Sequence, residues 1–262
     1  MIALTIDSEQ WNCPLLEGEK AEENNTNDFS RKGNEILLDL LRKHNIKATF
    51  FITGFFAENE PQQVKKIASL GHEIACHGYN HHYRGNKNFD LEEDIKKAKK
   101  ILEVIVGKKV IGFRAPQLQY SEDLLKILNR LGFKYDSSLH PTYLPGCYNN
   151  LDKPLRIFKP LNDSGILEIP LTVSPCRLPV SWMFMRIFGV NRTINSCKKS
   201  LEKGFNAVIY IHSWEFISIK SKLVPFYYKY HTGDTTTKLI EKFILSFKDR
   251  GITTLENLAS HK

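Results

Sequence analysis

The sequence lacks the features that mark several classes of protein. It has five cysteines but no Cys-x-x-Cys pair, which is typical of free thiols in a reducing compartment and not of a disulfide framework. No apolar run approaches the roughly 20 residues that span a bilayer, and the best candidate, 182–190, is interrupted by Arg186. No internal repeat or low-complexity segment is present, so the composition excludes a collagen, a coiled coil or a disordered chain.

A leader-like pattern is also absent from the first residues. The apolar run after Met1 reaches Asp7 too soon for a signal peptide, and no basic segment precedes it. We therefore expect a cytoplasmic protein. Two aromatic clusters, 182–185 and 226–228, leave peripheral contact with a membrane surface open.

Acidic residues are outnumbered, with 29 Asp and Glu against 37 Lys and Arg and a formal charge of +8. Such a balance suits acidic partners, including nucleic acid and phosphate-bearing substrates. The basic residues are nevertheless dispersed, and many share presumed helix faces with acids, as in 94–100. No recognition motif accompanies the charge, so we expect no nucleic-acid partner.

Short apolar runs rich in β-branched and aromatic residues alternate with longer segments of helical period. The predicted strands are 2–6, 48–53, 73–76, 110–113, 167–171 and 207–211, with a weaker one at 253–255. The predicted helices are 32–44, 61–70, 91–106, 121–131, 194–203 and 236–249, while 138–166 is expected to be irregular. This alternation predicts a parallel sheet, and a chain of 262 residues is consistent with one domain over 1–262.

Polar residues follow four of the predicted strands. They are Asp7 and Glu9, His77 and His81, Arg114, and His212. Because chemistry gathers at the carboxyl ends of parallel strands, we expect these side chains to meet on one face of the sheet.

The strongest local signal is the pair His77 and His81. Histidines four apart fall on one face of a helical turn, close enough to share a metal ion. A surface turn that happens to contain histidines is an equally open interpretation of this short pattern. His82 is expected to be a neighbour and not a ligand.

Asp7 and Glu9 end the first strand. Residues i and i+2 of an extended chain point to the same side, so both carboxylates can face the strand-end pocket. One of them can complete a two-histidine metal site while the other acts as a base. The alternative is an acidic turn in solvent.

Arg114 and His212 each have a structural alternative. A buried guanidinium would hold a catalytic carboxylate ionised and oriented, but Arg114 also fits an ordinary salt bridge. An imidazole at a strand end could protonate a leaving amine, but a lone His212 also fits a core histidine. Only the conjunction of these residues, in this order, favours catalysis.

That conjunction resembles the polysaccharide deacetylase superfamily, whose catalytic domain is the chitooligosaccharide deacetylase homology (NodB homology) domain. The branch with an Asp-x-Glu first motif is most similar, and the resemblance covers nearly the whole chain. The matching segments are 5–9, 45–51, 71–81, 112–116, 135–138 and 211–212.

The resemblance implies a distorted (β/α) barrel with about seven parallel strands and an N-deacetylase, a hydrolase of carbon–nitrogen bonds other than peptide bonds. Its substrate would be an N-acylated amino sugar that is nucleotide-, lipid- or oligosaccharide-linked, with phosphate as a handle for the positive charge. The implied roles are a base (Asp7), an acid (His212), ligands of Zn²⁺ or of another divalent ion such as Co²⁺ or Ni²⁺ (Glu9, His77, His81), a residue orienting the base (Arg114), an oxyanion-binding backbone amide (Gln117) and a residue positioning His212 (Asp136).

One departure from the family pattern keeps other functions open. The usual metal carboxylate directly follows the base, and Ser8 stands there in this sequence. Some relatives lack a metal and open cyclic ureides or imides, and a non-catalytic carbohydrate-binding barrel is a further alternative. Trp182, Trp214 and Tyr143 could stack on a sugar face. The sugar, the acyl group, the metal and the oligomeric state are left open.

Overall fold

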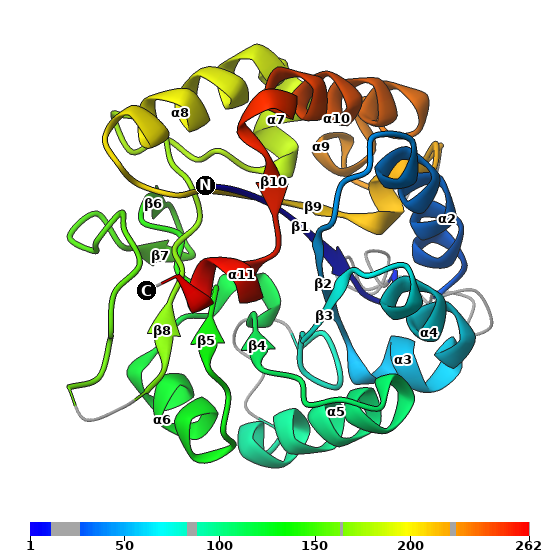
Figure 1. Ribbon diagram of the computed structural model, residues 1–262, viewed down its shortest axis with the longest axis vertical. Helices are drawn as coiled ribbons and strands as arrows, with labels where there is room; N and C mark the ends of the chain where they lie inside the picture. Colours follow the sequence, from blue (N-terminus) through cyan, green and yellow to red (C-terminus); the bar gives the residue numbers. More distant parts are fainter. Residues whose placement is uncertain (12–26, 83–87, 163–164, 221–223, 262) are drawn as a thin grey trace.

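The computed structural model describes residues 1–11, 27–82, 88–162, 165–220 and 224–261. A curled parallel sheet forms the centre, and a ring of helices surrounds it (Figure 1). The strand order is β9, β1, β2, β3, β4, β5, β8, which confirms the distorted barrel with seven parallel strands. Their bounds are β1 Ile2–Ser8, β2 Thr49–Ile52, β3 Glu73–Cys76, β4 Gly112–Phe113, β5 Tyr135–Asp136, β8 Leu167–Glu168 and β9 Ala207–His212.

The six predicted helices are confirmed, with ends that differ by a few residues. They are α2 Asp28–Lys43, α4 Pro61–Ser69, α5 Leu91–Val106, α6 Glu122–Arg130, α8 Val190–Glu202 and α10 Asp234–Ser246. Short helices were not predicted, namely α3 Gly54–Asn59, α7 Trp182–Phe188, α9 Phe226–Lys229 and α11 Leu255–Ser260, nor were the 3₁₀ turns η2 Pro116–Leu118, η3 Ser213–Phe216 and η4 Lys248–Arg250. In the described part of the chain, every helix is too short or too polar to cross a membrane.

The alternation of side chains along β1 divides the core into two layers. Ile2, Leu4 and Ile6 pack outward against the helices. Ala3 points into the barrel, where it packs in a second cluster with Leu255 and Leu258 of α11. Figure 1 shows α11 lying across the centre of the ring. Because α11 closes this end of the barrel, the strand ends at the opposite end are left for the polar residues.

The predicted strand at 253–255 is only partly correct. β10 (Ile252–Thr253) pairs with the first residues of β1, but α11 begins at Leu255. The helix starts there because the Thr254 hydroxyl accepts a hydrogen bond from the Asn257 amide at 3.4 Å and the Glu73 carboxylate accepts one from the Glu256 amide at 2.9 Å.

The segment 138–166 is more ordered than predicted. An antiparallel hairpin joins β6 (Tyr143–Leu144) to β7 (Tyr148–Asn149). The sequence did not predict these strands or β5, because two residues are too few for a period-2 pattern to be recognised. Within 138–166, residues 163–164 lie outside the described part of the chain.

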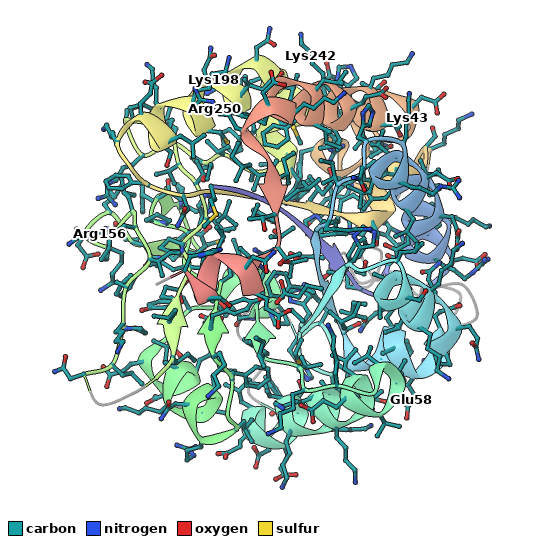
Figure 2. The ribbon with its side chains drawn as sticks, viewed as in Figure 1. Lys43, Glu58, Arg156, Lys198, Lys242 and Arg250 are labelled. Carbon is teal, nitrogen blue, oxygen red and sulfur yellow. The ribbon has the colours of Figure 1, made fainter. Side chains whose placement is uncertain are left out.

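Charged side chains lie around the outside of the helical ring, as Figure 2 shows for Lys43, Glu58 and Lys242. Several are paired with acids, for example Lys43 with Glu241 at 2.7 Å. The four described cysteines are free thiols, as predicted; they are Cys76, Cys147, Cys176 and Cys197. Cys13 lies outside the described residues.

Candidate active site

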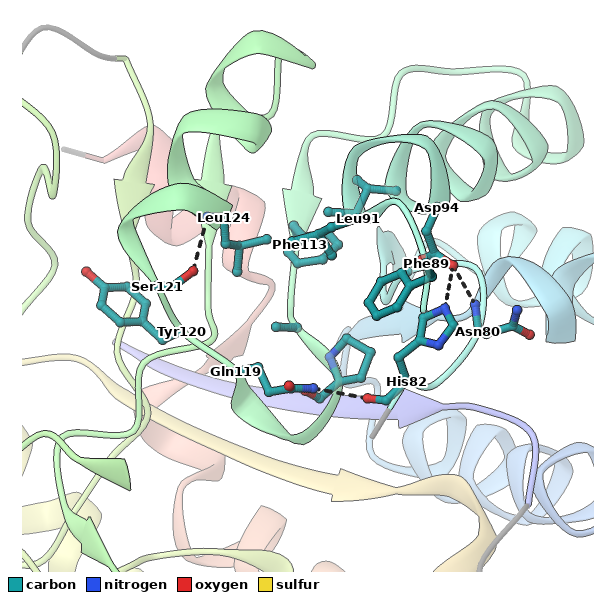
Figure 3. A pocket seen from close by; sticks show the side chains of 14 residues that line it. Asn80, His82, Phe89, Leu91, Asp94, Phe113, Gln119, Tyr120, Ser121 and Leu124 are labelled. Carbon is teal, nitrogen blue, oxygen red and sulfur yellow. Dashed lines mark hydrogen bonds and ion pairs between the residues drawn. The ribbon is translucent and has the colours of Figure 1, made fainter. Parts of the chain in front are cut away.

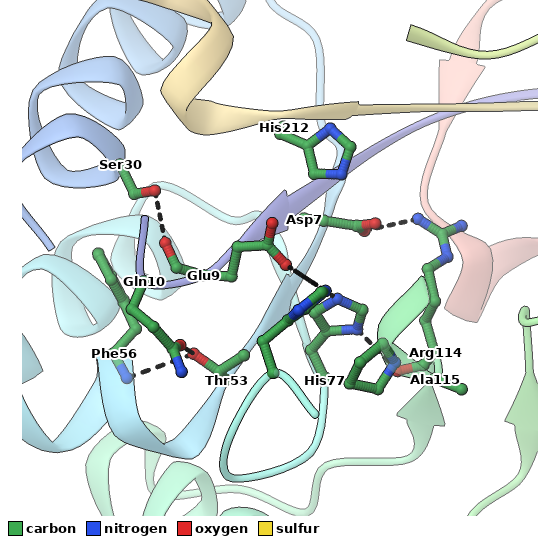
Figure 4. A network of polar contacts seen from close by, with 12 residues as sticks. Asp7, Glu9, Gln10, Ser30, Thr53, Phe56, His77, Arg114, Ala115 and His212 are labelled. Carbon is green, nitrogen blue, oxygen red and sulfur yellow. Dashed lines mark hydrogen bonds and ion pairs between the residues drawn. The ribbon is translucent and has the colours of Figure 1, made fainter. Parts of the chain in front are cut away.

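The polar residues singled out in the sequence meet at one end of the barrel, as predicted (Figure 4). Strands β1 and β9 run side by side with Asp7 opposite His212. His77 directly follows β3, and Arg114 directly follows β4, the next strand in the sheet. Parallel strands in register therefore bring together residues that are more than 200 positions apart in the sequence.

Glu9, His77 and His81 form the predicted ligand group. The Glu9 Oε2 atom lies 3.0 Å from His81 Nε2 and 3.4 Å from His77 Nε2. One ligand atom from each residue lies within 4.8 Å of the other two. Two imidazole nitrogens and a carboxylate oxygen are a donor set that Zn²⁺ takes in catalytic sites.

The protonation of these groups also fits a cation. His77 Nδ1 lies 2.7 Å from the Arg114 carbonyl oxygen, which requires a proton on Nδ1 and leaves the Nε2 lone pair facing Glu9. Burial acts to raise the pKa of Glu9, but His81 and His77 outweigh it and lower that pKa to about 2. Burial lowers the pKa of His81 to about 4. The three ligand atoms face one another, so a divalent ion between them would be held by one carboxylate oxygen and two imidazole nitrogens.

The predicted helical turn at His77–His81 is wrong. Residues 77–82 form a loop, in which Gly78 takes a left-handed conformation with φ +72°. Asp94 of α5 holds this loop, because its carboxylate accepts a hydrogen bond from the Tyr79 amide at 2.8 Å and lies 3.0 Å from His82 Nε2. His82 therefore pairs with Asp94 and is not a member of the ligand group, as expected.

Ser8 does not replace the usual metal carboxylate. Its hydroxyl donates a hydrogen bond to Asn34 of α2 at 2.9 Å, so it points away from the strand-end site, as alternation along β1 requires. Glu9, two residues after Asp7, reaches the histidines from the same side as Asp7. The Asp-x-Glu pattern thus places the predicted base and the predicted ligand at a single strand end.

Arg114 pairs with Asp7 as predicted. The guanidinium Nη1 lies 2.7 Å from Asp7 Oδ1 and also donates to the Thr5 hydroxyl at 2.8 Å. Arg114 is fully buried, and its Cζ lies 4.1 Å from the centre of the Phe51 ring. A guanidinium held in this way fixes the orientation of the partner carboxylate.

Glu215 takes the position beside His212 that the sequence reasoning gave to Asp136. Its Oε1 atom accepts a hydrogen bond from the His212 amide at 2.7 Å and lies 3.2 Å from His212 Nδ1. Its other oxygen lies 2.8 Å from Arg186 Nε, and both of these side chains are fully buried. Burial acts to lower the pKa of His212, but the hydrogen bond that the imidazole donates to Glu215 and the charge of Glu9 outweigh it, so the pKa is raised.

Asp136 belongs to a different network, and its predicted role is wrong. It accepts a hydrogen bond from the Ser138 hydroxyl at 2.6 Å, and Ser138 in turn accepts one from the Ala115 amide at 2.8 Å. Asp136 also lies opposite Glu168 in the pairing of β5 with β8. Burial raises the pKa of both carboxyl groups, so the pair keeps a proton. This network supports the turn after Arg114.

That turn also contains the predicted oxyanion donor. Gln117 and Leu118 both have positive φ angles, 52° and 53°, which non-glycine residues adopt at a cost of about 1 kcal/mol or more each. Strained backbone of this kind clusters at ligand-binding and catalytic sites. The role of the Gln117 amide stays a prediction.

The aromatic residues differ in how they could meet a sugar. Trp214 is nearly fully buried, stacked against His212 at 5.0 Å and packed on Trp11 at 4.6 Å, so it is a wall of the site and not an open platform. Trp182 is half-buried and meets His212 edge-on at 5.0 Å. Tyr143 is exposed on β6.

A cavity of about 360 Å³ borders the site between α5 and α6 (Figure 3). Its lining is largely apolar and includes Phe89, Leu91, Phe113 and Leu124. Gly78 and Pro116 also line it, so the loops that carry His77 and Arg114 share its wall.

The pairing of His212 with Glu215 leads to a prediction for the pH dependence. A general acid must be protonated, so turnover falls as pH rises through its pKa. Glu215→Gln removes the charge that raises the pKa of His212, and we expect the alkaline limb of the pH–rate profile to move to lower pH. The measurement is kcat against pH for both proteins. Asp136→Asn is the matched control, and an equal displacement in that variant would contradict the assignment.

Comparison with known proteins finds relatives of part of the chain. The family model described as polysaccharide deacetylase matches residues 21–135. The peptidoglycan deacetylase of Helicobacter pylori is 35% identical over 111 residues, which are 42% of this chain and 38% of that protein. The matched part is therefore well under half the length of that relative.

Solved structures of similar fold cover almost the whole chain. A protein of Mycobacterium smegmatis assigned to the polysaccharide deacetylases superposes with a TM-score of 0.70 at 22% identity, over 99% of this chain and 88% of that one. An allantoinase superposes with a TM-score of 0.69 at 17% identity, over 99% and 89% of the two chains. At such identities the likeness shows the fold alone, and two different activities share it.

Proposed function

We propose, from the resemblance to the polysaccharide deacetylase superfamily and with the support of the family match over residues 21–135, that this chain is a metal-dependent N-deacetylase. It would hydrolyse the N-acyl amide of an amino sugar, with residues 1–262 forming one catalytic domain. The observation that carries the proposal is the convergence of Glu9, His77 and His81 beside the Asp7–Arg114 pair and His212. A hydrolase of carbon–nitrogen bonds needs a base, an acid and a means of stabilising an oxyanion, and this site has residues for each.

The ligand group would hold a divalent ion, which supplies Lewis-acid polarisation of the amide carbonyl. Glu9 contributes negative charge and the two imidazoles contribute neutral nitrogen ligands, so the group leaves positions for water and substrate. Zn²⁺ fits these donors, and Co²⁺ or Ni²⁺ would be accepted by the same nitrogen and oxygen atoms.

Asp7 would act as the general base. Held in position by Arg114, it would take a proton from the attacking water, whose oxygen bonds to the acyl carbon. The Gln117 amide would donate to the oxyanion that forms. Arg114 stays fixed by Thr5 and Ser137 during the step, since it donates to both at 2.8 Å and 3.0 Å.

His212 would act as the general acid. With Nδ1 facing Glu215, its Nε2 proton is available for the departing amine. Proton transfer to that nitrogen accompanies cleavage of the carbon–nitrogen bond, so the products are a carboxylate and a free sugar amine. Trp182 and Trp214 limit the movement of the imidazole by contact on two sides.

The test combines metal analysis with an acyl-release assay. We expect purified protein to contain a divalent metal and to release acetate or formate from a panel of nucleotide-, lipid- and oligosaccharide-linked N-acyl amino sugars. Activity should disappear with a chelator and return with Zn²⁺ or Co²⁺.

A metal-free protein with full activity on a cyclic ureide would instead support the ring-opening amidohydrolase. A protein that binds oligosaccharides without turnover, unchanged by Asp7→Ala, would support the non-catalytic barrel. A cytoplasmic location and the absence of a nucleic-acid partner stay predictions.

A further inference from the structure

The net positive charge of the chain comes from one segment that is poor in acids. Residues 171–233 hold nine Lys and Arg against two Asp and Glu, whereas the remaining sequence has 28 against 27. One of the two acids, Glu215, is fully buried against Arg186. Nearly all of the formal charge of +8 therefore lies in the part of the chain that contains α7, α8, β9 and α9. Lysine and arginine are as frequent here as in the rest of the chain, so the excess reflects a scarcity of acids.

The same segment exposes large apolar side chains on two short helices. Ile187 and Phe188 of α7 are 37% and 57% exposed, and Phe226 and Tyr227 of α9 are 63% and 44% exposed. Phe184, half-buried, lies against Phe188 with ring centres 5.5 Å apart. Single exposed apolar residues are ordinary on protein surfaces, but a group on adjacent elements marks an interaction site.

Helices α7 and α9 form one surface because they pack together and Arg186 ties them. Its buried guanidinium donates to the backbone carbonyls of Tyr227, at 3.3 Å, and of Tyr230. We define the α7–α9 face as Phe184, Ile187, Phe188, Phe226 and Tyr227.

Basic side chains border this face. The Arg192 guanidinium lies 5.4 Å from the centre of the Phe188 ring. Lys229 ends α9, and the exposed Lys220 follows Ile219, whose amide donates to the Thr232 hydroxyl, three residues after Lys229, at 3.0 Å. Aromatic residues beside cations are the composition by which peripheral proteins bind anionic lipid surfaces.

The face lies next to the candidate active site. Trp182, the first residue of α7, contacts the imidazole of His212 and also Tyr228 of α9, with ring centres 5.6 Å apart. The aromatic residues that line the site are thus in contact with the two helices that carry the α7–α9 face.

We propose that the α7–α9 face docks on the surface of an anionic lipid bilayer. Phe188, Phe226 and Tyr227 would enter the boundary between headgroups and acyl chains, while Arg192, Lys220 and Lys229 contact the phosphates. A protein partner fits less well, because the cores of protein interfaces are depleted of lysine and need complementary acids to offset a basic rim. The proposal does not depend on the reaction catalysed, since binding is measured without turnover.

Vesicle co-sedimentation tests this directly. The full chain is mixed with vesicles of equimolar phosphatidylcholine and phosphatidylglycerol, or of phosphatidylcholine alone, at low and high salt. We expect binding to the anionic vesicles that weakens with salt and is much weaker on neutral ones. Lys220→Gln with Lys229→Gln should weaken binding about twenty-five-fold, from a contribution of about fivefold for each cation near the surface. Phe188→Ser with Phe226→Ser should weaken it about tenfold or more.

Matched controls lie elsewhere on the surface. Val104→Ser and Leu245→Ser remove apolar side chains that are 76% and 53% exposed on α5 and α10, and Lys242→Gln removes a cation of α10. These variants should bind as the parent chain does, and the thermal midpoint of each variant shows that it folds. The proposal is overturned if the parent chain does not sediment with anionic vesicles, or if the control variants lose as much binding as those on the α7–α9 face.

Discussion

Replacing His77 by alanine is expected to remove the metal and to lower turnover by about 10³-fold or more, because a bound metal stabilises the transition state by several kcal/mol and each 1.4 kcal/mol is a factor of ten. His77 is nearly fully buried, and its ring is fixed by the Arg114 carbonyl oxygen at 2.7 Å. Without it only Glu9 and His81 remain as ligands in the group. Metal content after dialysis and affinity by titration calorimetry give readouts that do not depend on the assay substrate.

The adjacent His82 offers a control of the same residue type. It lies in the same loop but pairs with Asp94, so His82→Ala should retain the metal and most of the activity. Glu9→Gln should weaken metal affinity more than Asp7→Asn does, because only Glu9 faces both imidazoles. Normal metal content in His77→Ala, or equal metal loss in His82→Ala, would rule out the ligand group.

The strand-end residues could be predicted because the physical rule that places them is local. Asp7 and Glu9 are two positions apart on an extended chain, and His77, Arg114 and His212 each follow a run of apolar strand residues. Parallel pairing then brings these ends together without further information. The ring of helices followed equally from long segments of helical period, such as Leu91–Val106, whose predicted bounds match the structure.

Residues that support the site from a distance could not be predicted in the same way. Glu215 reaches His212 because η3 turns the chain back after β9, and a single 3₁₀ turn has no periodic signature. Arg186 looked like an interruption of an apolar run, but its role depends on the packing of α7 against η3 and α9. Asp94 is one of several acids at the start of α5, and only the fold shows that it faces the His77–His82 loop.

There is a physical reason why Glu215, and not Asp136, pairs with His212. Asp136 ends β5, which is separated from β9 by the strands β4, β3, β2 and β1, and its carboxylate is committed to Ser138 and Glu168. Glu215 lies three residues after His212 on the same chain segment, so it does not have to span the distance between β5 and β9. The family motifs therefore indicate that an acid pairs with His212, but they do not indicate that the acid in this chain is Glu215.

Asp7→Asn is expected to lower kcat by about 10²–10⁴-fold, the range attributed to general acid–base catalysis, while leaving the metal bound. The amide keeps the shape of the side chain and an oxygen for Arg114, but it cannot take a proton from water. It also leaves the charge of a fully buried guanidinium without an ionised partner, so we expect the free energy of unfolding to fall by up to about 3–5 kcal/mol.

Thr5→Val is the matched control, because it removes another acceptor of Arg114, at 2.8 Å, and keeps the carboxylate. If Thr5→Val loses activity to the same extent as Asp7→Asn, the loss reflects the setting of Arg114 and Asp7 is not the base. If instead only Asp7→Asn is inactive and its metal content equals that of the parent chain, proton transfer by Asp7 is the remaining explanation.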